Sequence, residues 1–192
     1  MSGRNKPSNI VDRPLPKGRS EVSLSAFGFL FSELVQYSQK NVTHIGELEK
    51  KLEEAGQGVG ARLLEVLCYR DKQCRRDIRL LDTLKFIHTS VWKCCFNKAA
   101  DSLEQGNDAD DEFMISDRDL VVNRYISVPK DMGHLNCGGS FAAGIVKGVL
   151  EGAGFGCRVS AHFVAVPGSK KPKTTILMKF DEATMQREAR LG

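Results

Sequence analysis

Apolar residues between Ser20 and Lys40 recur at the spacing of an amphipathic helix. The residues that follow the pattern i, i+3, i+4, i+7, i+8 and share one face are Phe27, Leu30, Phe31, Leu34 and Val35. Leu24, Phe29 and Tyr37 extend the apolar surface well beyond that face. We therefore expect this helix to be covered on more than one side, either at the centre of its own domain or by a partner.

Three further helices are predicted between residues 43 and 103. The first begins at Thr43 and is expected to stop at Gly56, because glycine commonly ends helices. The second runs from about Val59 to Arg70. The third follows a charged turn, and its apolar stripe begins at Ile78 and can be extended as far as Leu103.

From residue 112 onward the pattern changes to short runs that are typical of strands. Four such runs are predicted, at residues 112–117, 120–128, 157–166 and 174–180. A helix at 138–154 lies between the strands, and a polar helical tail follows the last one. The fold class is therefore α+β, with four N-terminal helices packed on one face of an antiparallel sheet and a further helix between strands.

The domain organisation follows from length and composition. A chain of 192 residues with 41% hydrophobic residues can bury the core of a single domain. Residues 1–19 contain three prolines and several charges, so we expect a flexible lead-in there and a single α+β domain over residues 20–192. No apolar run approaches the roughly 20 residues needed to cross a bilayer, so any membrane contact is expected to be peripheral.

The charge balance gives no sign of nucleic-acid binding. The net charge of +4 arises from 28 basic and 24 acidic residues. Much of the excess lies within residues 1–19 and 170–173, which we interpret as solvated segments. A nucleic-acid-binding face usually concentrates a larger excess on one element.

No motif predicts catalysis. Ser140 lies in a sequence close to a nucleophile elbow, but Ala142 replaces the usual second glycine, and only His162 follows as a potential base. We therefore expect Ser140 to be a helix-start residue. The glycines at 56, 58 and 60 lack a preceding strand, so they indicate a helix end or a tight helix crossing instead of a phosphate loop.

The six cysteines predict neither a metal site nor a disulfide framework. The chain has no Cys-x-x-Cys, and the adjacent Cys94 and Cys95 would point about 100° apart on a helix. A chain of this length without a signal peptide is expected to be cytosolic, with reduced thiols. No cofactor is predicted.

Several segments carry a family resemblance. Residues Gly58-Val-Gly-Ala-Arg-Leu-Leu-Glu65 are similar to a Gly-x-Gly-x-Arg-Leu-hydrophobic-Glu signature. The other segments that match in order are 21–36, 91–93, 123–129, 135–137, 141–146 and 174–180. Together, over about residues 20–192, they resemble the small-subunit family of the transport protein particle (TRAPP), in its Bet-three-like subfamily.

The resemblance implies a docking surface on the first helix. Members of this family have an antiparallel sheet with helices on one side, and they dimerise through their first helices. The interface candidates are therefore Phe27, Phe29, Leu30, Phe31 and Leu34. On this interpretation Phe31→Asp should leave a foldable chain that no longer joins its partner.

The resemblance also implies a function. It indicates a non-catalytic subunit that joins the family's central, acyl-binding subunit and its sedlin-like longin subunit. That assembly tethers vesicles between the endoplasmic reticulum (ER) and the Golgi, and supports nucleotide exchange on a Rab GTPase. The expected location is cytoplasmic, peripheral at Golgi and ER membranes.

One departure and two alternatives stay open at this point. The central family member carries an acylated cysteine after the Arg-Leu-hydrophobic-Glu signature. Here Cys74 follows at a similar but not identical distance within a charged turn, so acylation of Cys74 is a minor expectation. The alternatives are a stand-alone module that holds an acyl chain or another apolar ligand, and a hydrolase built on Ser140.

Overall fold

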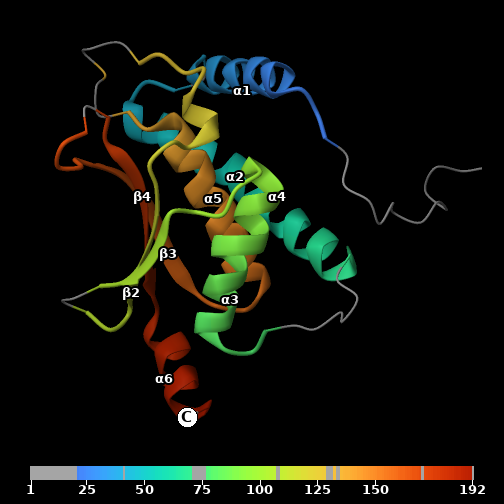
Figure 1. Cartoon of the computed structure of the whole chain (residues 1–192), viewed down its shortest axis with the longest axis vertical. Coiled ribbons are helices and arrows are strands. Elements are labelled where there is room, and N and C mark those ends of the chain that lie inside the picture. Colours follow the sequence, from blue (N-terminus) through green and yellow to red (C-terminus); the bar gives the residue numbers. More distant parts are fainter. Residues whose placement is uncertain are drawn as a thin grey trace, which may run out of the picture.

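The computed structural model describes residues 21–40, 42–70, 77–106, 109–128, 132, 135–169 and 171–191. The predicted lead-in at 1–19 and the candidate acylation site Cys74 lie outside this part of the chain. The described residues form an α+β fold, with helices to one side of a four-stranded antiparallel sheet (Figure 1). The predicted fold class is confirmed, although the helices are fewer and are arranged differently.

The sheet is antiparallel throughout and has the order β1-β2-β4-β3. Its strands are β1 (Ser102–Gln105), β2 (Glu112–Asp117), β3 (Cys157–Val164) and β4 (Lys173–Phe180). The register pairs Ile115 with Ile176 and Val159 with Met178. Since strand side chains alternate between faces, these four residues share the buried face of the sheet.

The helix that lies directly on this sheet is α5 (Cys137–Gly152), which packs against β3 and β4. Asn136 caps its N-terminus by accepting a hydrogen bond from the backbone N–H of Gly139 at 2.9 Å. Helix α2 (Ile45–Arg70) packs mainly on the other side of α5, so it forms a second helical layer.

The α2–α5 crossing brings the two backbones together through glycine. A Cβ atom at any of four positions would overlap a backbone carbonyl oxygen of the facing helix. These close approaches are Gly56 with Phe141, Gly60 with Ile145, Gly144 with Glu53 and Gly148 with Gln57. Small residues spaced four apart on both helices therefore set the interhelical distance, and the predicted tight helix crossing is confirmed.

A third helical rod runs from α3 (Leu80–Phe86) through a π-helical turn, η2 (Ile87–Val91), into α4 (Trp92–Phe96). It ends at Asn97, which adopts a left-handed conformation with φ 59°. The indole N–H of Trp92 donates to the buried carboxylate of Asp117 at 2.9 Å, and Lys98 pairs with the same carboxylate. This network attaches the rod to the end of β2.

The C-terminal helix α6 (Glu182–Leu191) closes the end of the domain where α3 begins. The carboxylate of Glu188 accepts the backbone N–H of Leu80 at 3.0 Å and pairs with Arg79 at 3.2 Å. The guanidinium of Arg187 lies 4.9 Å from the ring centre of Phe155. The polar tail predicted from the sequence is thus a docked helix.

The structure differs from the secondary structure predicted from the sequence at three places. Helix α2 continues through Gly56, because this glycine is needed for the approach of α5 and not for a helix end. The run at 120–128 contains a short 3-10 helix, η3 (Val121–Asn123), followed by turns, instead of a strand. Strand β1 was missed, because its four residues, two half-buried and two exposed, carry no alternating apolar pattern.

Candidate docking interface

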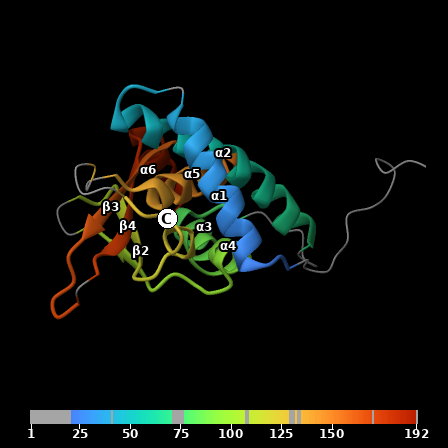
Figure 2. The same ribbon diagram turned by 90° about the horizontal axis from the view of Figure 1, so that it is seen from above.

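The first helix, α1 (Leu24–Gln39), lies along the outside of the helical layer, side by side with α2 (Figure 2). One of its two apolar faces is buried. On that face Phe31 is only 3% exposed, and its ring centre lies 5.2 Å from that of Phe141 on α5. The ring of Phe27 stacks on Phe31 at 6.3 Å, and Leu34 packs against the same core.

A second contact fixes α1 from the side. Gly28 faces the ring of Tyr125, so closely that a Cβ atom at this position would overlap the ring edge. Tyr125 follows η3, and Arg124 beside it forms an ion pair with Asp119. This hydrogen-bonded pairing with Arg124 lowers the pKa of the Asp119 carboxyl group. The 123–129 segment carries part of the family resemblance, but its sequence does not predict this contact.

The opposite face of α1 is apolar and exposed. Phe29 is 78% exposed and Leu30 is 70% exposed, and Tyr37 lies two turns beyond on the same side. Each residue turns about 100° around a helix axis, so Phe29 lies roughly opposite the buried Phe31. The inner apolar face of α1 is therefore buried against the fold, whereas Phe29 and Leu30 on the outer side are exposed.

The five predicted interface residues therefore separate into two groups. Phe29 and Leu30 project outward, whereas Phe31 belongs to the core of its own domain, and Phe27 and Leu34 are half-buried against it. The expectation that Phe31→Asp would leave a foldable chain was wrong, because the new carboxylate would be buried without a partner. A stricter count of helical angles around Phe31 would have separated the two groups.

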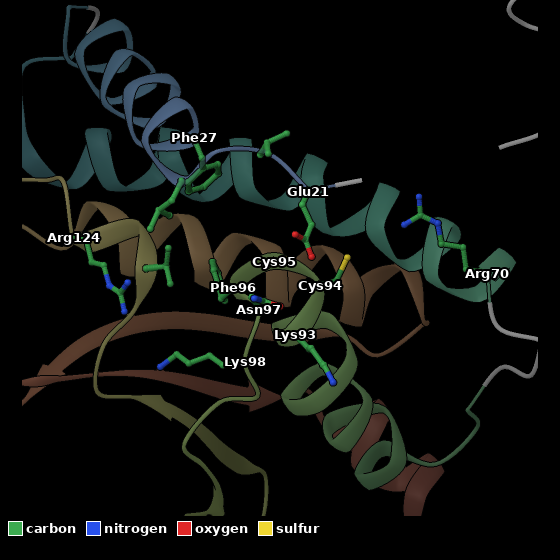
Figure 3. Close-up of a pocket in the computed structure, with 13 residues that line it drawn as sticks. Glu21, Phe27, Arg70, Lys93, Cys94, Cys95, Phe96, Asn97, Lys98 and Arg124 are labelled. Carbon is green, nitrogen blue, oxygen red and sulfur yellow. The ribbon is translucent and has the colours of Figure 1, made fainter. Parts of the chain in front are cut away.

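A pocket of about 540 Å³ opens beside the start of α1 (Figure 3). Glu21 extends across it towards Cys94 and Cys95 at the end of α4. The remaining lining is apolar at Val22, Leu24, Phe27, Phe96 and Val121, and basic at Arg70, Lys93, Lys98 and Arg124. Charged groups from several elements thus share the pocket lining with apolar groups, unlike the enclosed apolar lining that suits an acyl chain.

The described cysteines are free thiols. Burial raises the pKa of Cys95 to about 12, and it raises the pKa of Cys157 to about 12 as well. A thiol at that pKa is protonated at neutral pH and is a poor nucleophile. Among the residues that the structure describes, no group of three or more metal-ligating side chains comes together.

The structure does not bring Ser140 and His162 together. Ser140 lies in the first turn of α5, where its backbone N–H donates to the carbonyl of Asn136 at 2.8 Å. His162 is on β3, and its Nε2 atom lies 2.8 Å from the hydroxyl of Ser160. Over the described ranges, no helix has both the length and the apolar character needed to span a membrane.

Comparison with known proteins identifies the family to which this chain belongs. The family model for transport protein particle (TRAPP) components matches residues 27–181, which include α1 from Phe27 onward and the whole sheet. The chain belongs to the TRAPP component family. It is 54% identical to trafficking protein particle complex subunit 5 of Dictyostelium discoideum over 183 residues, covering 95% of this chain and 98% of the relative.

Other relatives agree with this assignment. Human trafficking protein particle complex subunit 5 is 45% identical over 184 residues, covering 96% of this chain and 94% of the relative. Within the TRAPP family the chain is of the subunit 5 type. A crystal structure of subunit 3 from Naegleria fowleri, covalently bound to palmitic acid, has the same fold, with a TM-score of 0.66. It covers 83% of this chain and 95% of its own, at 18% identity.

Proposed function

We propose that this TRAPP component binds another subunit of the assembly through the outer face of α1. Family membership supplies the general function, that of a non-catalytic component of a vesicle-tethering complex. The observation that carries the specific proposal is the exposure of Phe29 and Leu30 on a helix whose inner face is fixed by Phe31. Clustered exposed aromatic and aliphatic side chains are typical of protein interfaces.

The partner that we propose for this face is the central, acyl-binding TRAPP subunit, with the sedlin-like longin subunit as a second neighbour. In this arrangement the chain acts at ER-to-Golgi transport, in the cytoplasm and at the periphery of both membranes. It would support Rab nucleotide exchange only through the assembly. The structure supports this role because α1 is held from two sides, so it presents a preformed surface with little ordering cost.

The pocket beside α1 suggests a second candidate function, the binding of an acyl chain. The palmitate of the Naegleria subunit 3 structure belongs to that protein, whose 18% identity supports a common fold alone. The charged side chains in the pocket lining, of both signs, do not suit a buried acyl chain. Native mass spectrometry of the purified chain distinguishes the two functions, since a bound lipid adds its own mass.

Co-expression tests the proposed function. The chain is produced with the central subunit and the sedlin-like subunit from the same source, and the products are separated by size-exclusion chromatography. A stoichiometric complex that contains this chain is the expected result. A monomer that elutes apart from both proteins would remove the support for a docking role of α1.

A further inference from the structure

The outer face of α1 carries a single charge. Glu33 is the only charged residue between Leu24 and Gln39, and it is exposed. It lies four residues after Phe29, three after Leu30 and four before Tyr37, which are the spacings of helical neighbours. Its carboxylate therefore lies at the centre of the apolar surface and not at the rim.

Among the residues that the structure describes, no side chain neutralises this carboxylate. Within the part of the chain that the structure describes, Glu33 takes part in no ion pair and no hydrogen bond from its side chain. Some acidic groups on other elements do have a basic partner, as Asp119 has Arg124 and Glu53 has Lys147 at 2.7 Å. Glu33 is exposed to water, which solvates it as long as the face is free.

Covering this face changes the surroundings of the carboxylate. A partner that buries Phe29 and Leu30 also removes water from Glu33 between them. An unpaired buried charge is strongly unfavourable, whereas a hydrogen-bonded pair with Lys or Arg restores the lost solvation. A well-matched partner surface is therefore apolar with one basic side chain near its centre.

A second copy of this chain does not meet that requirement. In a two-fold pairing of α1 with itself, the same patch faces itself, so two Glu33 carboxylates enter one interface and the helix brings no cation between Leu24 and Gln39. Lys40 follows Glu33 by two turns. An antiparallel pairing of two α1 helices could place Glu33 of one copy beside Lys40 of the other, with the two-fold axis near Gln36. In that pairing Phe29 and Leu30 would lie at the ends of the contact between the helices and would be poorly buried.

We infer that Glu33 is a specificity-determining residue of the α1 face, which selects a partner helix carrying Lys or Arg and disfavours pairing with a second copy. This inference rests on the proposed docking function of α1. Like charges placed opposite one another discriminate between partners even where the apolar contacts are equally good. The apolar side chains thus provide most of the binding affinity, and Glu33 determines which partner is preferred.

The test uses Glu33→Gln, which keeps the shape and removes the charge, with Glu104→Gln as a matched control on the exposed edge strand β1. Sedimentation equilibrium measures self-association of each chain alone. Titration calorimetry measures affinity for the central, acyl-binding TRAPP subunit of the same source, at low and high salt. For Glu33→Gln we expect self-association about tenfold stronger and hetero-affinity about tenfold weaker, with a smaller salt dependence.

The outcomes separate this inference from the proposed function. If Glu33→Gln changes neither self-association nor salt dependence while Phe29→Asp still abolishes the complex, α1 is the docking face and the role of Glu33 is refuted. If Phe29→Asp leaves the complex intact, the docking function itself fails. The self-association arm needs no partner, so it tests Glu33 whether or not a complex forms.

Discussion

The ring of Phe31 packs 5.2 Å from the ring of Phe141, and this contact determines which side of α1 faces outward. Phe141 lies on α5, the helix that covers the sheet, so α1 is anchored directly to the centre of the fold. With Phe31 fixed inward, Phe29 must project into solvent. The exposed face of α1 is therefore a consequence of core packing.

Phe31→Ala should destabilise the domain. Removing a buried phenylalanine ring typically costs about 3–5 kcal/mol, through lost burial and the cavity that remains. The free energy of unfolding from urea titration measures this change. Phe29→Ala is the matched control, since truncation of a side chain that is 78% exposed should change stability by less than about 0.5 kcal/mol. Equal effects of the two substitutions would contradict the assignment of the faces.

Gly60→Ala should disrupt the α2–α5 crossing. Its methyl group would overlap the carbonyl oxygen of Ile145, and neither backbone can move away without separating the helices. We expect a loss of about 3 kcal/mol or more in thermal or urea unfolding. Gly46→Ala, in the same helix with open space around it, should instead be neutral or stabilise by about 0.5 kcal/mol. A well-tolerated Gly60→Ala would mean that the helices are not in close contact.

The glycines of α2 also show which features of the fold the sequence could not predict. Local patterns predicted α1, α5 and the β3–β4 hairpin correctly, because each has a strong period or a clear turn. They misjudged Gly56, since a glycine that ends a helix and one that admits a neighbouring backbone look the same in sequence. Only tertiary structure distinguishes them. Strand β1 was missed for a related reason, because its pairing with β2 and not its own composition makes it a strand.

The sequence indicated an apolar surplus on α1 but not how its residues divide between an inner and an outer face. The apolar surplus of α1 indicated that a partner or the fold must cover more than one side. The family resemblance then grouped Phe31 with Phe29, although these residues face opposite directions. The contact between Tyr125 and Gly28 could not be derived, since nearly one hundred residues separate them and neither has a periodic neighbour pattern.

Buried thiols should resist alkylation. Because burial raises the pKa of Cys95 and of Cys157 to about 12, both remain protonated at pH 8, and only the thiolate reacts. Iodoacetamide should modify them about a thousandfold more slowly in the folded chain than in guanidinium, as followed by peptide mass spectrometry. As the pH rises towards 12 the folded-state rate should increase. Rapid modification at pH 8 would show that these sites are open.

The central claim is that α1 docks a TRAPP subunit through Phe29 and Leu30, and the double variant Phe29→Asp, Leu30→Asp tests it most directly. Its affinity for the central, acyl-binding TRAPP subunit of the same source is measured by titration calorimetry, with the melting temperature as a control for folding. Phe163→Asp, which replaces an exposed phenylalanine on β3, controls for charge. We predict at least a hundredfold loss of affinity for the double variant alone, with unchanged melting. Wild-type affinity in the double variant would contradict the account.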